Sequence, residues 1–192
     1  MSTEPQKNHQ HSGTLSPEFA LLGFLVSEPR HGYDLHQRFV TELGNVWHLS
    51  QSQAYAILKR LENRGDISVR LVEQDKLPAR QMLRITPSGR QRFMDWLENG
   101  SGSNARSIRL EFLTRLYFSN LYTPKNTTRI YAAQYAEIEN ACQRLKDLIA
   151  HLPPEQAYNR LSLDLRLRQM KLIHQWMTEI KTQFHIPTGE SS

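Results

Sequence analysis

The residues best suited to specific chemistry lie on one side of a helix expected between positions 50 and 64. That side carries hydroxyl, methyl, ammonium and amide groups, flanked by a phenol and a guanidinium: Ser52, Ala56, Lys59, Asn63, Tyr55 and Arg60. A solvated helix face more often carries paired Glu and Lys, whereas the only acid of this helix, Glu62, lies to one side. Small, hydrogen-bonding and basic groups of this kind suit the base edges and phosphates of a DNA groove.

The candidate contacts divide into groups for base edges and groups for the phosphate backbone. We expect Ser52, Gln53 and Ala56 to reach base edges, because glutamine pairs with adenine and a small apolar side chain meets the thymine methyl group. Tyr55 and Lys59 are assigned to phosphates, and Lys59 can also reach guanine. The complete candidate set, with neighbouring elements included, is Tyr33, Ser50, Gln51, Ser52, Gln53, Tyr55, Ala56, Lys59, Arg60, Lys76 and Arg80.

Three of these assignments compete with simpler roles. Tyr55 lies beside the apolar stripe, so partial packing in the core is the alternative to a phosphate contact. Tyr33 stands at the start of the preceding helix, where backbone amides favour an anion, but it can equally pack against the first helix. Arg60 and the neighbouring Arg64 can remain solvated or pair with nearby acids.

Local signals define the helix that presents this face. Ser50 and Gln53 have the spacing of an N-terminal capping box, and Gly65 stands where a helix usually ends. Ala54, Ile57, Leu58 and Leu61 recur at helical spacing and therefore share the buried side.

The surrounding elements indicate a winged helix-turn-helix. Helices are expected from Ser16-Pro17 to Val26 and from Tyr33 to about Leu43, and a further helix from Ser88 to Leu97 follows a Thr86-Pro87 cap. Between the third and fourth helices, residues 67–72 and 81–85 alternate like strands. We expect residues 73–80 to form a polar loop, the wing, from which Lys76 and Arg80 would touch the DNA backbone or minor groove.

Several short motifs resemble, in order and spacing, the signature of PadR-type transcriptional regulators. They are His31-Gly32-Tyr33-Asp34-Leu35, Leu49-Ser50 with Ala54-Tyr55, the run from Leu58 to Gly65, and the run from Arg84 to Arg90. The sequence from Arg106 onward resembles the helical C-terminal domain of the larger members, including the virulence activators. The resemblance implies a DNA-binding transcriptional regulator, mainly helical with a small hairpin wing, and a C-terminal helical, coiled-coil-like dimerisation domain.

Two heptad-like seams support a helical hairpin in the C-terminal part. Apolar residues recur at steps of three and four from Tyr131 to Leu152, and Pro153-Pro154 interrupts the chain before a second seam. The second seam, assigned to dimerisation, consists of Met170, Ile173, Met177, Ile180 and Phe184. The alternative is that the two seams pack on each other within one chain. A second subunit is favoured because too many other leucines remain for a two-helix hairpin to bury.

Composition sets the limits of these assignments. The 192 residues carry a net charge of +5, but residues 15–99 contain 11 Lys or Arg against 10 Asp or Glu. Bulk charge is therefore weak support for DNA binding. A lone cysteine, Cys142, fits a reducing cytoplasm, and the sequence has no apolar run long enough to span a bilayer. We expect tails at 1–14 and 187–192, a DNA-binding domain at 15–99, a linker at 100–105 and a dimerisation domain at 106–186.

No residue pattern favours catalysis, a cofactor or a metal site, because the histidines lack ligand spacing and no nucleophile motif occurs. We expect a homodimeric repressor on a palindromic operator, since one winged module binds DNA weakly. Aromatic residues that could form a pocket for a small aromatic effector are Trp96, Tyr117, Tyr131, Tyr135 and Trp176, although core packing explains them too. The alternative function is a helical adaptor whose winged domain binds protein.

Overall fold

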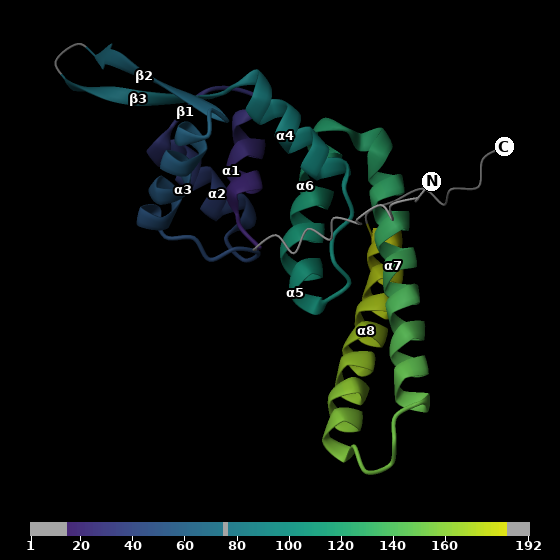
Figure 1. Cartoon of the computed structure of the whole chain (residues 1–192). Helices are drawn as coiled ribbons and strands as arrows, with labels where there is room; N and C mark the ends of the chain where they lie inside the picture. Colours follow the sequence, from purple (N-terminus) through teal and green to yellow (C-terminus); the bar gives the residue numbers. More distant parts are fainter. Residues whose placement is uncertain (1–14, 75–76, 184–192) are drawn as a thin grey trace, which may run out of the picture.

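The computed structural model describes residues 15–74 and 77–183, and it is mainly helical with one small sheet (Figure 1). Its elements, in chain order, are α1 (Glu18–Leu25), β1 (Arg30–His31), α2 (Gly32–Leu43), α3 (Gln51–Asn63), β2 (Ile67–Gln74), β3 (Leu77–Ile85), α4 (Pro87–Glu98), α5 (Ala105–Ser107), the π-helical turn η1 (Ile108–Phe112), α6 (Leu113–Tyr122), α7 (Pro124–Ala150) and α8 (Ala157–Gln183). The predicted fold class, a winged helix-turn-helix followed by a helical region, is confirmed.

The capping box predicted for α3 is present in full. The Gln53 amide nitrogen donates to the Ser50 hydroxyl at 3.2 Å, and the Ser50 amide donates to the Gln53 side-chain oxygen at 3.0 Å. Gly65, just beyond the helix, has a φ of 80°, which a residue without a β-carbon adopts without strain. The four residues of the predicted apolar stripe are buried, so α3 turns its polar side outward.

The wing differs from the prediction, because its strands continue through most of the expected loop. β2 extends to Gln74 and β3 begins at Leu77, with Val72 opposite Arg80 and an irregularity between Val72 and Gln74. The hairpin projects beyond the helices (Figure 1), so its strands need no apolar alternation to pair. The predicted strand ends relied on the alternation of polar and apolar side chains. The strands are held together by backbone hydrogen bonds, which do not depend on that alternation.

A third strand was not predicted. Arg30 and His31 form β1, antiparallel to β3 opposite Leu83 and Met82, and the sheet order is β1-β3-β2. The ring Nδ1 of His31 lies 3.0 Å from the Gln81 carbonyl oxygen, so this side chain ties the start of α2 to the sheet. Two residues are too few to produce a strand pattern in a sequence.

The first hydrophobic cluster joins α1–α4 and the sheet, and it also takes in residues from the segment after the expected linker. Leu110 and Phe118 are buried in this cluster. The Phe118 ring covers Gly23 so closely that a β-carbon there would lie 2.5 Å from the ring, and the Tyr122 hydroxyl donates to the Gly23 carbonyl at 2.7 Å. The expected boundary at 100–105 therefore does not separate two independent cores.

The π-helical turn η1 lies between α5 and α6. The Thr114 hydroxyl donates to the Leu110 carbonyl oxygen at 2.6 Å, and the Trp47 indole N–H donates to the same hydroxyl at 2.8 Å. A hydroxyl that bonds the carbonyl four residues earlier competes with the helical backbone donor, which accounts for the irregular turn.

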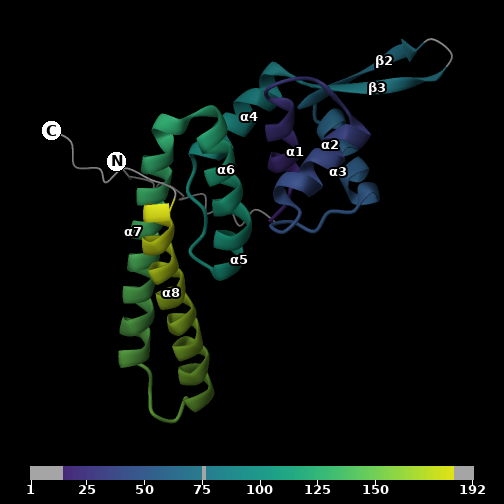
Figure 2. The ribbon, with the colours of Figure 1, turned by 180° about the vertical axis from the view of Figure 1, so that it is seen from behind.

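The second cluster shows that the two C-terminal seams pack on each other. α7 and α8 form an antiparallel hairpin (Figures 1 and 2), closed by a 2.5 Å hydrogen bond from the Tyr131 hydroxyl to the Met177 carbonyl. Met170, Met177 and Ile180 are buried and Ile173 is half-buried within this single chain. The assignment of these four residues to a subunit interface is corrected accordingly: they form the intramolecular seam. Phe184, assigned with them, lies outside the described residues.

Candidate nucleic-acid interface

The polar face of α3 is fully available to solvent. Its candidate residues are all exposed: Ser50, Gln51, Ser52, Gln53, Tyr55, Ala56, Lys59 and Arg60. Tyr33, at the start of α2, is also exposed and shares a cavity with Tyr55 and Lys59. Of the two wing candidates, Arg80 lies on β3 opposite Val72, and Lys76 lies outside the described residues. The structure therefore brings the candidates from α2 and α3 to one surface.

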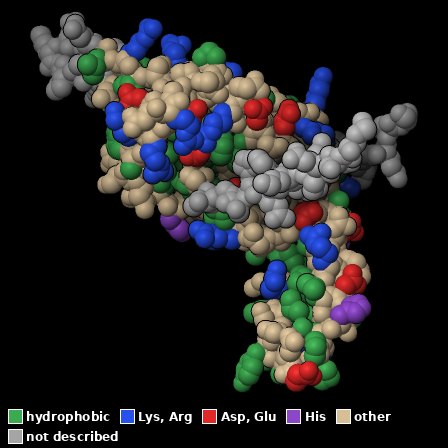
Figure 3. All heavy atoms as spheres, in the orientation of Figure 1, with side chains coloured by type: hydrophobic (Ala, Val, Ile, Leu, Met, Phe, Trp, Pro, Cys, Tyr) green, Lys and Arg blue, Asp and Glu red, His purple; other side chains and the backbone are tan. Residues whose placement is uncertain are grey.

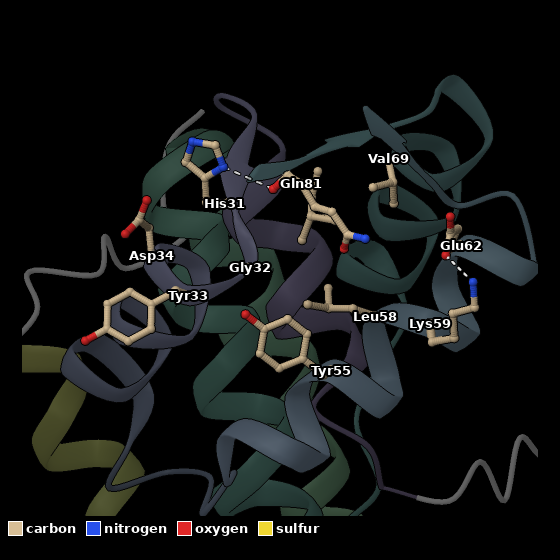
Figure 4. Close-up of a pocket in the computed structure, with 11 residues that line it drawn as sticks. His31, Gly32, Tyr33, Asp34, Tyr55, Leu58, Lys59, Glu62, Val69 and Gln81 are labelled. Atoms are coloured by element: carbon tan, nitrogen blue, oxygen red, sulfur yellow. Dashed lines mark hydrogen bonds and ion pairs between the residues drawn. The ribbon is translucent and has the colours of Figure 1, made fainter. Parts of the chain in front are cut away.

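A cavity of about 490 Å³ lies between the start of α2, the outer side of α3 and the sheet (Figure 4). Tyr55 lies across its middle, with Tyr33 and Asp34 at one end and Lys59 and Glu62 at the other. The Tyr55 ring covers Gly32, where an added β-carbon would lie 2.9 Å from the ring. Tyr55 is thus partly packed, as the alternative proposed, and its side chain is nevertheless 43 % exposed.

Lys59 has a partner that the sequence analysis did not assign. Its ammonium nitrogen lies 2.8 Å from Glu62 Oε2, one turn further along α3. The spacing of three residues is the sequence signal for such a pair in a helix. Both side chains are solvated, so the pair is weak and Lys59 can exchange it for another anion.

Gln53 has two assignments that compete for the same atom. Its side-chain oxygen accepts the Ser50 amide, whereas bidentate pairing with adenine requires both that oxygen and the side-chain amide nitrogen. While the cap is intact, only the NH₂ group of Gln53 is available as a donor to DNA.

Ionic contacts fix the end of α3 relative to α1 and α4. Arg92 on α4 contacts both Glu18 on α1 and Asp66, with a distance of 2.8 Å to Asp66 Oδ2. Arg64, just after α3, lies 3.3 Å from Glu18 and 3.7 Å from Asp66. Pairing with nearby acids, one of the alternatives left open for Arg64, is therefore the arrangement found. Burial by itself would raise the pKa of the Glu18 carboxyl, but hydrogen bonds and charge from Arg92 and Arg64 lower it below 4.5.

The five candidate effector residues are divided between the two hydrophobic clusters of the described residues. Trp96 and Tyr117 belong to the first cluster, whereas Tyr131, Tyr135 and Trp176 belong to the second. The cavity beside α3 and a second cavity of about 380 Å³ between residues 103–105, α7 and α8 are lined by other residues. Trp96 stacks on Phe19 with ring centroids 4.7 Å apart, as expected of core aromatic residues.

Arg115, which the sequence analysis did not select, lies against Trp96. Its guanidinium carbon is 4.6 Å from the centre of the Trp96 ring, and the residue is only 4 % exposed. Its Nε and Nη1 atoms have no hydrogen-bond partner among the described residues. Burial lowers the pKa of Arg115 to about 10, partly offset by Glu111. A charged residue in an otherwise apolar helical pattern was the signal available in the sequence.

Cys142 lies in the seam of α7, as predicted, and burial raises the pKa of its thiol. No group of three His, Cys, Asp or Glu side chains in the described ranges is arranged to hold a metal ion. None of the described helices is both long and apolar enough to cross a membrane.

The three-helix core, hairpin wing and exposed α3 define a winged helix-turn-helix protein. A family model described as the transcriptional regulator PadR-like family matches residues 21–95, which extend from α1 to α4. This part of the chain therefore matches the PadR-like family of transcriptional regulators, which its motifs resemble.

Two relatives and two solved structures are similar to the chain. It is 29 % identical to the negative transcriptional regulator PadR of Bacillus subtilis over 131 residues, 68 % of this chain and 70 % of the relative. It is 30 % identical to a probable transcriptional regulator of Mycobacterium tuberculosis over 78 residues, 41 % of each chain. Crystal structures of Bacillus subtilis PadR, 25 % identical, give TM-scores of 0.44 with operator DNA and 0.39 with p-coumaric acid. The first alignment covers 86 % of this chain and 96 % of that chain, the second 85 % and 92 %.

The ionic contacts at the end of α3 make stability depend on pH. Because the folded-state pKa of Glu18 is lowered, its contribution is present above the ordinary value of 4.5 and is lost as pH falls through the folded value. Replacing Glu18 by Gln should lower the free energy of unfolding most above about pH 6. The difference from wild type should shrink below pH 4.5. Urea unfolding at a series of pH values measures this difference in the free energy of unfolding. Glu155→Gln is the control, because it removes one carboxylate elsewhere. A difference that does not change with pH contradicts the ionic role of Glu18.

Proposed function

We propose that this chain is a DNA-binding transcriptional regulator that places α3 in the major groove. The observation that carries this proposal is the exposed face of α3, where hydroxyl, amide, small apolar and basic side chains stand together on a helix fixed at both ends. In winged helix-turn-helix proteins, the second helix of the helix-turn-helix motif, which corresponds to α3 here, contacts base edges in this manner. We propose residues 15–99 as the DNA-binding region, joined through residues 100–105 to a dimerisation region over residues 106–186.

Within this interface, Gln51, Ser52 and Ala56 are our proposed contacts with base edges. Gln53 contributes its NH₂ group while its oxygen keeps the helix cap. Tyr33, Tyr55, Lys59 and Arg60 are proposed for phosphates, because exposed hydroxyls and cations along a helix commonly bind the backbone. Ser50 acts through the cap, and Lys76 and Arg80 remain proposed contacts of the wing.

We propose a homodimer that represses transcription from a palindromic operator. The Bacillus subtilis relative carries the name of a negative regulator, and one winged module alone discriminates poorly among DNA sites. The corrected seam requires a different dimer surface. Apolar residues at spacings of three, four and seven form an exposed stripe on another face of α8: Tyr158, Leu161, Leu165 and Leu172. Exposed apolar side chains on the hairpin are visible in Figure 3, and an unpaired stripe of this kind is typical of a subunit contact.

We also propose control by a small aromatic acid bound near Trp96. Arg115 supports a carboxylate in the ligand, because its buried guanidinium has two N–H groups without partners among the described residues. Guanidinium N–H groups form strong charge-assisted hydrogen bonds with carboxylates, and the adjacent indole provides an apolar surface for a ring.

The DNA proposal is tested with Lys59→Ala. Losing one phosphate contact should weaken binding to every duplex and reduce the slope of log K against log salt by about one. Both effects are measured by gel retardation over a salt series. The two duplexes are the DNA upstream of the gene that encodes this protein and a duplex of random sequence. Lys171→Ala on α8 is the matched control. Absence of any salt-dependent retention would favour the adaptor that the sequence analysis left open.

The dimer proposal is tested with Leu165→Glu. Leu165 is 59 % exposed in the single chain, so the added charge should leave the fold intact while preventing two apolar stripes from meeting. Sedimentation at micromolar concentration should give a dimer for the wild type and a monomer for the variant. Thr182→Glu adds the same charge to an exposed polar position of α8 and should stay dimeric. A monomeric wild type, or a dimeric Leu165→Glu variant, refutes this surface.

The effector proposal is tested with two ligands that differ in one group. p-Coumarate should quench tryptophan fluorescence and bind at least about tenfold more tightly than p-coumaryl alcohol, which lacks the carboxylate. Arg115→Lys keeps a charge but loses the planar fork, so it should reduce this preference. Equal affinity for acid and alcohol would contradict the role of Arg115.

A further inference from the structure

The cavity beside α3 has a composition that a phosphate-binding surface alone does not explain. We propose that it binds lipophilic organic cations, and that such a cation and DNA exclude each other. The exclusion rests on the proposed DNA-binding function, whereas cation binding follows from the cavity itself. The proposal is carried by the charges, the aromatic and apolar side chains and the location of the cavity.

The charges around this cavity favour a cation. Two carboxylates, from Asp34 and Glu62, stand at opposite ends, against the single ammonium of Lys59 (Figure 4). Lys59 is already paired with Glu62. Asp34 is exposed and forms no ion pair with any residue in the described ranges. With His31 counted as neutral, the lining is net negative, so an anion inside the cavity is opposed and a cation is attracted.

The aromatic and apolar side chains of the cavity favour an organic cation over a hydrated metal ion. Tyr33 and Tyr55 are 55 % and 43 % exposed, so faces of both rings are available for cation–π contacts. Apolar side chains also line the cavity, from Leu58, Val69 and Leu83. Cationic ligands with apolar bodies are recognised by this combination of aromatic groups and nearby carboxylates. The volume of about 490 Å³ accommodates a small-molecule ligand.

The location of the cavity links its occupation to DNA binding. Three of its lining residues, Tyr33, Tyr55 and Lys59, are among the proposed phosphate contacts of α2 and α3. A ligand that stacks on the two tyrosines would cover their rings and stand between them and the DNA backbone. The cavity would therefore provide a direct, competitive release from DNA, separate from any effector bound near Trp96.

The test uses tetraphenylphosphonium and tetraphenylborate, which have nearly the same shape and opposite charge. In calorimetric titrations of the full chain, the phosphonium should bind at least about tenfold more tightly than the borate. Asp34→Asn should weaken phosphonium binding about fivefold, and Tyr55→Leu should weaken it similarly, because each removes one attractive group. Glu155→Gln, which removes an exposed carboxylate between α7 and α8, should leave the affinity unchanged. Equal binding of the two ions, or no effect of Asp34→Asn and Tyr55→Leu, overturns the cation site.

Gel retardation separates this proposal from the DNA proposal. The phosphonium should raise the protein concentration needed for retardation, with less effect on Asp34→Asn than on the wild type. Retardation that is unchanged by a saturating phosphonium concentration overturns the exclusion while leaving the DNA-binding proposal intact. If the protein retards no DNA without phosphonium, the DNA-binding proposal and the exclusion both fail, and calorimetry alone decides the cation site.

Discussion

The packing of Phe118 against Gly23 is the contact on which the arrangement of the whole chain depends. The ring occupies the space that a β-carbon at Gly23 would fill, and it meets Phe24 and Phe93 edge-on. α6 thereby completes the core of the winged helix-turn-helix. Through Leu116, and through Phe112 just before it, the same helical segment also joins the cluster formed with α7 and α8. Because one helix serves two cores, a shift of the C-terminal hairpin cannot leave the helices beneath α3 unaffected.

Polar contacts determine how α3 stands relative to the wing. The Thr86 hydroxyl donates to the Gly65 carbonyl at 2.7 Å, and Gly89 lies so close to Asp66 that a β-carbon would be 2.0 Å from its carbonyl oxygen. Together with the Arg92 contacts, these bonds join the end of α3, the start of β2 and the start of α4. The recognition surface is thus positioned by a junction on the side of the domain remote from the cap of Ser50, and both ends of α3 are restrained.

The features predicted correctly from the sequence are those encoded by neighbouring residues. The cap of α3, its apolar stripe and the break at Gly65 each depend on a few positions of the chain, and all three are present. The features missed depend on distant residues. β1 exists only because β3, some fifty residues later, supplies its hydrogen bonds. Likewise, a heptad seam records that a helix face is buried but not which helix buries it, so the second seam was assigned to another subunit. Glu62 and Arg115 were passed over because their significance arises from Lys59 and Trp96 beside them.

The charge distribution around α3 favours short-range contacts with DNA over long-range electrostatic attraction. The N-terminal region is nearly neutral, and the cavity beside α3 is net negative, so long-range attraction to DNA contributes little there. In the proposed DNA complex, binding would then depend on short-range contacts that release Lys59 from Glu62 and desolvate Tyr33 and Tyr55. Short-range contacts are sensitive to small displacements of α3 and to anything that occupies the cavity. Under the proposed function, an interface with so little net positive charge is easily switched, and the C-terminal half of the chain is built into the same core as that interface.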